Sequence, residues 1–496
     1  MTKKFDNVVA NDNVSFDLHW GEVLALLGEN GSGKTTLMNM LFGIYFPDMG
    51  EIEVSGKSVT IRSPKDAHML GIGMVHQHFK LVDVFTATEN IILGMEGAAF
   101  IDRKAAKRKI AEICERYGFE LDPDKKIYNM PVSEKQTVEI VKLLYRGADI
   151  LILDEPTAVL TATEGERLFA TLKKLKDDKK AVIIITHKLN EVMSVSDRVH
   201  ILRKGQSIAT VNTADTSQKE LTEMMVGRAV SLEISRPMVE NKEDRLYVEN
   251  LSCLTADGAK ALQNISFTLQ SGEILGVAGI AGSGQRELCE IITGLYPVEE
   301  GKITYHTEDD KMTEIVGKTP RAIKDLGIAM AFVPEDRLGM GLVANMDITD
   351  NVMLRYYEDG SGPFVNRKSS RSLAEKLVER LKIVTPGVSK PVRRMSGGNV
   401  QKVLIGREIE SAPRVLIVAY PVRGLDINSS YAIYDLINQQ KQAGVAVLFI
   451  GEDLDVLLGI SDRIMVMNGG HVTGIIDGRT ATKEQVGMLM TATPEK

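Results

Sequence analysis

The stretch Val23-Leu-Ala-Leu-Leu-Gly-Glu-Asn-Gly-Ser-Gly-Lys-Thr-Thr36 decides the fold of the first half of the chain. Its first five residues, 23–27, form a short apolar run that predicts a buried strand. Residues 28–36 then fit the pattern G-x-x-x-x-G-K-[ST], in which a glycine-rich turn between a strand and a helix surrounds a phosphate with backbone N–H groups. The stretch therefore predicts a phosphate-binding loop within an α/β domain.

Two residues of this loop carry the expected chemistry. Lys34 can reach the β- and γ-phosphates of a nucleotide, and the Thr35 hydroxyl can ligate Mg2+. A tight glycine-rich turn without a ligand is the alternative reading of the motif. The predicted nucleotide-binding residues of the loop are Gly28, Glu29, Asn30, Gly31, Ser32, Gly33, Lys34, Thr35 and Thr36.

The chain contains the same pattern twice. The sequence NVSFDLHWGE at 13–22 is echoed by NISFTLQSGE at 264–273, an offset of 251, and VIIITH at 182–187 is echoed by VLFIGE at 447–452, an offset of 265. We therefore expect two homologous domains, 1–235 and 236–496, joined through a polar segment at 231–244. A strand expected at 246–251 has no counterpart in the first half, which predicts a missing edge strand there or a start upstream of Met1.

Short apolar runs alternate with amphipathic stretches in both halves. The runs 23–27, 150–153 and 182–185 predict strands, and the stretches 103–117 and 164–175 predict helices. Continuous apolar strands separated by helices are typical of a parallel sheet that is buried on both faces. Such sheets bind ligands at the carboxyl ends of their strands.

The composition is that of a globular protein. Of the 496 residues, 44% are hydrophobic, and the formal net charge of −7 argues against a general nucleic-acid binder. The three cysteines lie far apart in the sequence and suggest neither a disulfide framework nor a metal site. No apolar run approaches the roughly 18 residues of a membrane-spanning helix, so we expect any membrane association to come through partner proteins.

Two acidic residues at a strand end point to hydrolysis. The sequence ILILDE at 150–155 places Asp154 where it can hold Mg2+ through water, and Glu155 where it can polarise an attacking water. Gln77 is suited to sensing Mg2+ and water, and His187 could contact the γ-phosphate. Taken without the phosphate loop, the two acids could simply cap a turn, and Gln77 and His187 could be structural.

These motifs together resemble the nucleotide-binding domains of ATP-binding cassette (ABC) proteins. The resemblance implies two tandem P-loop NTPase domains, each with a mainly parallel sheet core, an antiparallel β subdomain and a helical subdomain. It implies that ATP lies between the phosphate loop of one domain and a signature motif of the other, here Met395-Ser-Gly-Gly-Asn399, which we expect at the start of a helix. The signature residues expected to contact ATP are Ser396, Gly397, Gly398 and Asn399, and Phe5 resembles the aromatic residue that stacks on adenine, although core packing is its alternative role.

The second half lacks the catalytic residue types. The offset of 251 puts Gln285 and Arg286 at the positions of Lys34 and Thr35. The offset of 265 puts Ala419, Tyr420 and Glu452 at those of Asp154, Glu155 and His187, and Glu335 stands in place of the glutamine after the middle strand. The signature of the first half reads Met-Pro-Val-Ser-Glu, in which proline lacks a backbone N–H and serine adds a Cβ where glycine is usual. All losses fall on one of the two composite sites, which predicts a single hydrolytic site per chain. The residues expected at the degenerate site are Gln285, Arg286, Ala419, Tyr420, Glu452, Pro131 and Ser133.

Two fused cassettes, one of them degenerate, resemble the ATPase subunits of bacterial sugar and nucleoside importers. The second-half sequences VPEDR at 333–337 and SGGNVQKV at 396–403 are similar to motifs of that group, and GMVHQHF at 73–79 looks more like its nucleoside branch. The resemblance implies ATP and Mg2+ as cofactors, two integral-membrane permease subunits, an extracellular solute-binding lipoprotein, and a location at the cytoplasmic face of the membrane. Residues 78–93 are expected to face a permease or to pack internally.

Three alternatives remain at this stage. A ribose-, galactose- or xylose-type sugar importer differs from the nucleoside reading by only a few residues. A soluble tandem-cassette translation factor would keep both sites intact and carry a long charged linker, and the sequence has neither feature. A nucleotide-sensing regulator would not need Glu155, and an absence of ATP turnover would support it.

Overall fold

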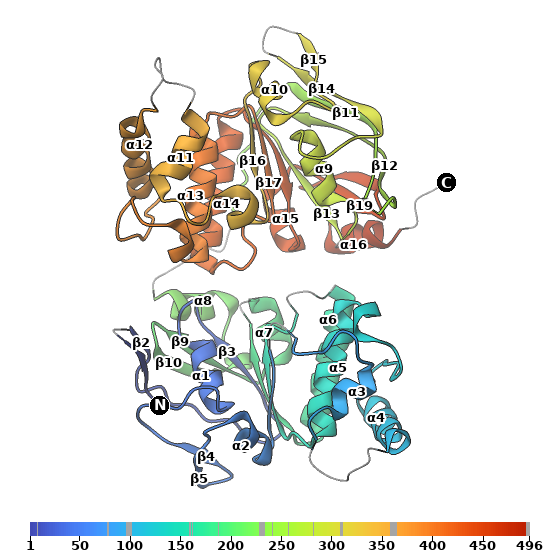
Figure 1. The fold of residues 1–496 in the computed structure, drawn as a ribbon, viewed down its shortest axis with the longest axis vertical. Helices are drawn as coiled ribbons and strands as arrows, with labels where there is room; N and C mark the ends of the chain where they lie inside the picture. The colour runs from blue at the N-terminus through green and yellow to red at the C-terminus, as the bar shows by residue number, and fades with distance from the viewer. Residues whose placement is uncertain are drawn as a thin grey trace. The chain divides into compact units, whose positions relative to one another are not determined.

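The computed structural model describes two compact units, Met1–Ser231 and Leu232–Lys496. The predicted boundary between 235 and 236 lies a few residues after this division and stays a proposal. The described residues are 1–6, 8–76, 79–95, 102–157, 160, 162–186, 188–227, 234–240, 242–255, 257–280, 282–307, 311–357 and 365–492 (Figure 1). No helix in these ranges is long and apolar enough to cross a membrane.

The first unit is built on a six-stranded sheet with the strand order β10-β9-β3-β8-β7-β6. All neighbours pair in parallel except the edge strand β10, which runs antiparallel to β9. The predicted strand runs are confirmed, and β3 and β8 are buried along their whole length, as expected for a sheet covered on both faces. The strands are β3 (Val23–Leu27), β6 (Ile72–Val75), β7 (Ile150–Asp154), β8 (Ala181–Ile185), β9 (Arg198–Arg203) and β10 (Gln206–Asn212).

Helices cover this sheet on both faces. Figure 1 shows α3, α4 and α5 gathered beside one another, and they share an apolar core that includes Ile91, Ile110 and Val138. This group is the helical subdomain that the resemblance implied. The helices are α1 (Lys34–Leu41), α2 (Pro64–Met69), α3 (Ala87–Ile92), α4 (Arg103–Tyr117), α5 (Val132–Tyr145), α6 (Ala162–Asp177), α7 (Leu189–Val195) and α8 (Gln218–Val226), with short 3-10 turns at Ile127–Asn129 and Thr213–Asp215.

The antiparallel part differs between the units. In the first, the described residues form two separate hairpins, β1 (Lys3–Phe5) with β2 (Val8–Asn11) and β4 (Ile52–Val54) with β5 (Lys57–Val59). In the second, β11 (Asp244–Leu254), β12 (Lys260–Gln270), β14 (Glu300–His306) and β15 (Met312–Glu314) form one sheet in the order β12-β11-β14-β15. The 11-residue strands β11 and β12 pair over most of their length, with several register shifts, whereas β1 has only three residues.

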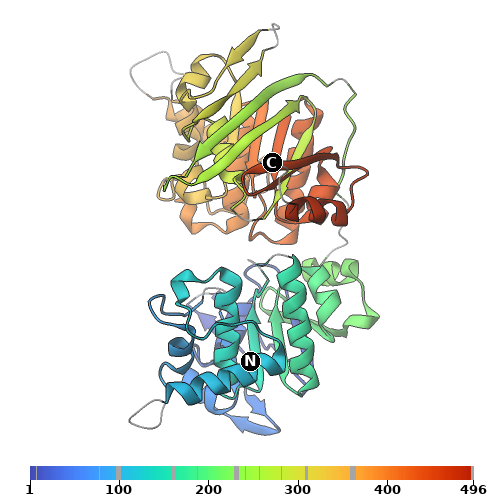
Figure 2. The same ribbon diagram turned by 90° about the vertical axis from the view of Figure 1, so that its right-hand side faces the viewer.

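The second unit repeats the parallel core. Its six-stranded sheet has the order β16-β17-β18-β13-β19-β20, again with one antiparallel edge strand. The two long green strands that cross beside this sheet in Figure 2 are β11 and β12. The core strands are β13 (Ile274–Gly279), β16 (Met330–Val333), β17 (Val415–Ala419), β18 (Ala446–Ile450), β19 (Arg463–Asn468) and β20 (His471–Asp477).

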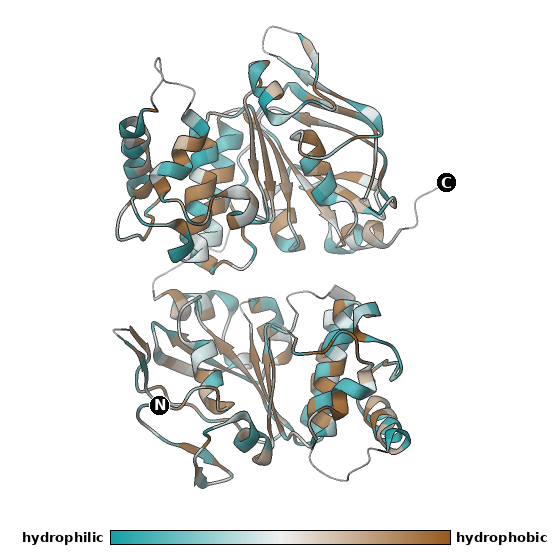
Figure 3. Ribbon diagram, viewed as in Figure 1, coloured by the Kyte–Doolittle hydropathy of each residue, from teal (hydrophilic) through white to brown (hydrophobic). Residues whose placement is uncertain are grey.

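The helices of the second unit form corresponding layers. Figure 1 places α11, α12, α13 and α14 together on one side of the sheet and α9 on the other, and Figure 3 shows the strands of the sheet as the most apolar segments. The helices are α9 (Gln285–Ile292), α10 (Pro320–Asp325), α11 (Ile348–Tyr356), α12 (Arg367–Arg380), α13 (Gly397–Glu410), α14 (Ile427–Gln442), α15 (Leu454–Ile460) and α16 (Lys483–Thr491), with a π turn at Arg337–Gly341 and a 3-10 turn at Val392–Arg394.

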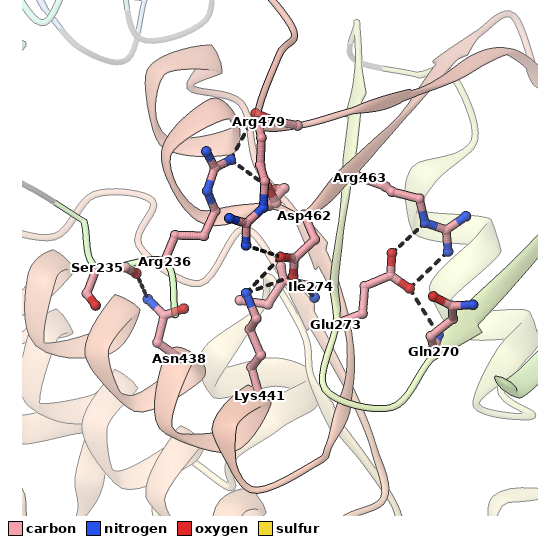
Figure 4. A network of polar contacts seen from close by, with 12 residues as sticks. Ser235, Arg236, Gln270, Glu273, Ile274, Asn438, Lys441, Asp462, Arg463 and Arg479 are labelled. Atoms are coloured by element: carbon pink, nitrogen blue, oxygen red, sulfur yellow. Dashed lines mark hydrogen bonds and ion pairs between the residues drawn. The ribbon is translucent and has the colours of Figure 1, made fainter. Parts of the chain in front are cut away.

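A polar network fixes the first described residues of the second unit to its core (Figure 4). Nη1 of Arg236 donates to the carbonyls of Leu458, Ser461 and Gly478 at 3.0, 2.8 and 2.9 Å. Since Leu458 lies in the last turn of α15, whose final carbonyls have no partner within the helix, Arg236 acts as a cap of that helix.

Candidate functional site

The phosphate loop of the first unit joins β3 to α1. Gly33 precedes the helix in the left-handed region with φ of 98°, and a Cβ there would lie 2.4 Å from the carbonyl oxygen of Ala10. A Cβ on Gly28 would lie 2.3 Å from Oγ of Ser32. Both positions therefore require glycine, and the loop has the strand, turn and helix arrangement that the sequence predicted.

Lys34 lies inside this loop. It is 9% exposed, and its Nζ donates to the carbonyls of Gly28 at 2.6 Å and Glu29 at 3.0 Å. Oγ of Ser32 is buried and has no hydrogen-bond partner among the described residues. An ammonium group and an unpartnered hydroxyl beside a helix N-terminus fit the phosphates of a nucleotide. Of the other predicted loop residues, Asn30, Gly31 and Thr35 are exposed, whereas Thr36 is half-buried.

Two carboxylates lie at the carboxyl end of β7, Asp154 as its last residue and Glu155 directly after it. Burial and, to a smaller extent, the charge of Glu155 raise the pKa of Asp154 against the opposing charge of Lys34, to about 6. Burial in turn lowers the pKa of Lys34, while the charges of Glu155, Asp154 and Glu29 oppose that change. The ammonium group and both carboxylates therefore act on one another electrostatically, and the carboxylates supply the hard oxygen ligands that Mg2+ prefers.

The backbone holds Glu155 in an uncommon conformation. Its φ is 48°, and its N–H donates to the carbonyl of Ile185 at the end of β8 with a distance of 2.8 Å. This bond fixes the turn after β7 against the neighbouring strand. The turn directs the chain away from the sheet immediately after Asp154.

The other two predicted catalytic residues, Gln77 and His187, lie outside the described residues. Their neighbours in sequence, His76 and Thr186, follow β6 and β8. Because β6, β7, β8 and β3 are adjacent and parallel, the segments that follow them all leave the sheet at one edge. The catalytic roles of Gln77 and His187 at this edge of the sheet therefore stay predictions that rest on their positions in the sequence.

Phe5 lies in β1 and is 38% exposed. Its ring meets that of Tyr45 edge to face at a centroid distance of 5.1 Å, and Nζ of Lys3 lies 5.5 Å from its centroid. The ring is accessible to a ligand, and stacking on adenine stays a prediction.

The signature of the second half begins α13. Ser396 precedes the helix, and its Oγ accepts a hydrogen bond of 2.8 Å from Nδ2 of Asn399. Ser396 and Gly397 are exposed, whereas Gly398 is buried and a Cβ there would lie 2.6 Å from Oγ of Ser429. The helix thus starts where the sequence predicted.

The corresponding helix of the first half, α5, starts differently. It begins at Val132 after Pro131, which makes no side-chain cap, and Ser133 lies in its first turn. Proline has no N–H to offer a ligand, so this helix start has one donor fewer than that of α13.

The second half keeps the loop geometry with other side chains. Gln285 is the first residue of α9, is 3% exposed, and donates from Nε2 to the carbonyl of Ile280 at 3.1 Å. This carbonyl follows β13 as that of Glu29 follows β3, so the amide takes the place of the Lys34 ammonium group without its charge. Arg286 pairs with Glu290 at 2.6 Å.

The strand-end acids are also replaced. Ala419 ends β17, and Tyr420 has φ of 48° and donates from its N–H to the carbonyl of Ile450 at 2.9 Å, as Glu155 does in the first unit. Burial, with the charges of Glu335 and Glu452, raises the pKa of Tyr420 to about 12.

Sequence reasoning missed Arg423, whose side chain pairs with both Glu335 and Glu452. The signal that could have found it is a cation at the position where the first half has Ala158, combined with acids at two other replaced positions.

Comparison with known proteins agrees with this architecture. The chain is 45% identical over 495 residues to the nucleoside import ATP-binding protein NupA of Lactococcus lactis, covering 99% of this chain and 96% of that protein. It is 42% identical to the guanosine import ATP-binding protein NupO of Bacillus subtilis, covering 100% and 96%. The ribose import ATP-binding protein RbsA 1 of Rubrobacter xylanophilus is 39% identical, with coverage of 100% and 97%.

A solved structure shares the fold of this chain, and a family model matches both of its halves. An archaeal ribosome recycling factor in complex with a ribosomal stalk protein matches with a TM-score of 0.66 at 18% identity, covering 98% of this chain and 92% of that one, which shows a shared fold alone. The ABC transporter family description matches residues 11–158 and 262–421, once in each half. The chain therefore belongs to the ABC transporter family.

Proposed function

We propose that this chain is the ATP-hydrolysing subunit of an importer that takes up a nucleoside through membrane permease subunits. The observation that carries the proposal is the contrast between two loops of the same geometry. Lys34, Asp154 and Glu155 interact at the first loop, whereas Gln285, Ala419 and Tyr420 stand at the second. ATP with Mg2+ is the ligand pair of the first site.

Each residue of the first site has a separate role in this proposal. Lys34 binds the β- and γ-phosphates, Thr35 and Asp154 hold Mg2+, and Glu155 polarises the attacking water. Gln77 senses Mg2+ and water, and His187 contacts the γ-phosphate. Bound Mg2+ stabilises the negative charge that develops on the transferred phosphoryl group.

The signature of the second half is proposed to serve the ATP held by the first half. This assignment follows the family resemblance and the start of α13, where Ser396 and Gly397 are exposed. The signature of the first half offers Pro131 at the same place and is proposed to be inactive. One hydrolytic site per chain is the consequence.

Exposed apolar residues of both helical subdomains support the proposed permease partners. In the first unit, Val84 and Leu93 flank α3 and are 64% and 47% exposed. In the second, Val343 precedes α11 and Leu354 lies within it, and they are 43% and 42% exposed. Large apolar side chains are unfavourable in water and are typical of protein contacts. We propose that permease subunits cover them at the cytoplasmic face of the membrane, while an extracellular lipoprotein delivers the solute.

The identity of the solute rests on the relatives and on the sequence at 73–79. NupA and NupO, whose names give nucleoside and guanosine, are more similar to this chain than the ribose-type protein is. A sugar of the ribose type is the second candidate because RbsA 1 matches over the same length.

Uptake in the native host tests the proposal. Labelled guanosine and labelled ribose are supplied to cells that carry the wild-type chain, Glu155→Gln or Gln285→Ala at equal expression. We expect Glu155→Gln to abolish guanosine uptake alone and Gln285→Ala to change it far less. Loss of ribose uptake instead would assign the sugar branch. No loss of either would contradict the importer role, and absence of ATP turnover with the permeases present would favour a sensing role.

A further inference from the structure

Three loops at the edge of the second sheet are joined by charges. Glu335, Arg423 and Glu452 follow the adjacent strands β16, β17 and β18. The Arg423 guanidinium pairs with Glu335, and its Nε lies 3.4 Å from Oε1 of Glu452. The Arg423 side chain, which follows β17, therefore bridges the loop after β16 and the loop after β18.

A second arginine joins the same loop to the start of α13. Nη2 of Arg337 donates to the backbone carbonyl of Arg423. Its Nη1 would lie 3.3 Å from a Cβ on Gly397, so the guanidinium borders the first residue of the helix. Burial lowers the pKa of Arg337 and the charge of Glu335 opposes this. We call Glu335, Arg337, Arg423 and Glu452 the charge clasp.

The loop after β17 also supports α13 directly. Cδ2 of Leu425 would lie 3.8 Å from a Cβ on Gly397, and Oγ of Ser429 would lie 2.6 Å from one on Gly398. Ser429 is held in turn by Asp426, which accepts from its N–H at 2.9 Å and from its Oγ at 2.8 Å. The first turn of α13 thus rests on Leu425 in the loop that Arg423 fixes and on Ser429 in the first turn of α14, which follows that loop.

The sequence of the first half has no corresponding set of charges. The offset of 265 puts Ala158 at the position of Arg423 and His187 at that of Glu452, and Gln77 stands in place of Glu335. At the equivalent positions of the second half, the ionisable side chains of Glu335, Arg423 and Glu452 form ion pairs.

We propose that Arg423 is a positioning residue, and that the charge clasp fixes the signature Ser396–Asn399 on the second-half core without nucleotide. The inference rests on the proposed function, in which this signature serves the ATP of the first half. The residues that replaced the catalytic set of the second half thereby support hydrolysis at the other site.

The test compares Arg423→Gln and Arg423→Lys in the full chain assembled with its permeases. Arg371→Gln is the matched control, because Arg371 forms an exposed pair of 3.0 Å with Glu375 on α12 of the same unit. Two quantities are measured: the kcat and KM of ATP hydrolysis, and hydrogen exchange without nucleotide in peptides covering 335–341 and 396–404. Exchange in β13 and β17 reports whether the variants are folded.

We expect Arg423→Gln to speed exchange at 396–404 and to lower kcat, each about five- to tenfold, with KM within twofold. Arg423→Lys keeps a cation and should restore at least half of kcat, and Arg371→Gln should match the wild type. Wild-type exchange in Arg423→Gln overturns the inference, as does wild-type kcat. If the wild-type chain itself hydrolyses no ATP, the proposed function fails instead, and the exchange measurement alone then supports or overturns the clasp.

Discussion

Replacing Lys34 by methionine tests the electrostatics of the first site. Methionine keeps most of the apolar stem and removes the charge that faces Asp154 and Glu155. The matched control is Gln285→Met, since Gln285 occupies the same place in the second loop, where Ala419 and Tyr420 replace the acids. Any difference between the two variants therefore reports the charge and not the loop.

The stability effect depends on pH through Asp154. Its carboxyl has a pKa of about 6 in the folded chain, against an ordinary value of 3.8, so ionising it at pH 7.5 disfavours the folded state by about 3 kcal/mol. The raised pKa means that this cost grows as the pH rises from 3.8 through 6 and is absent below both values. Removing the Lys34 ammonium group raises the pKa of Asp154 further. The added shift is about 1, which is the lower end of what an opposite charge contributes.

Lys34→Met should therefore lose about 1 kcal/mol more at pH 7.5 than at pH 5. Urea unfolding read by hydrogen exchange in peptides from 23–41 measures this for the first unit alone. ATP turnover should fall by about two to three orders of magnitude, as when an aligned electrostatic group is lost. Equal losses at both pH values, or an equal loss of turnover in Gln285→Met, would refute the reasoning.

Three further changes probe the second unit and Glu155. Glu155→Gln should abolish ATP turnover at any pH while ATP binding, followed by a fluorescent analogue, persists. Lys441→Met should lower the free energy of unfolding of the second unit by about 3 kcal/mol, the lower end of the range for a broken buried pair, because Asp462 loses its partner at 2.8 Å but keeps Arg479 at 3.3 Å. Urea unfolding measures this loss, and an unchanged midpoint would contradict it. Arg236→Ala should cost the same unit about 2 to 4 kcal/mol through three carbonyls left without their charged donor, with Arg236→Lys expected to recover part of the loss.

The parts of the fold that sequence predicted are those specified locally. The phosphate loop fixes β3, the turn and α1 because glycine, lysine and threonine must stand at set spacings, and α4 matches the predicted helix at both ends, Arg103 and Tyr117. The start of α13 was predicted by a similarly local motif. The internal repeat then transferred each assignment from one half to the other.

What could not be predicted depends on contacts between distant segments. Arg423 meets Glu335 across 88 residues of sequence, and only the order of β16, β17 and β18 in the sheet brings them together. In the sequence, Arg236 is likewise only a single arginine in a polar stretch. Its three carbonyl partners lie more than 200 residues away and come together only in the folded unit. Neither residue belongs to a periodic pattern or a spaced motif.

The backbone of Tyr420 indicates that the loop after β17 keeps a structural role although the catalytic residue types are absent from the second half. A φ of 48° is unfavourable for a bulky residue, and such strain costs about 1 to 3 kcal/mol. In the first half Glu155, the proposed catalytic carboxylate, has the same φ. Tyr420 has no carboxylate to direct, yet the strained turn and its bond to Ile450 are kept. What the turn still determines is the path of the following residues, and these include Arg423, Leu425 and Asp426. The support that this loop gives to α13 accounts for the kept turn. Since glycine adopts this φ without strain, Tyr420→Gly should keep the turn, and hydrogen exchange at 396–404 should stay near the wild-type rate.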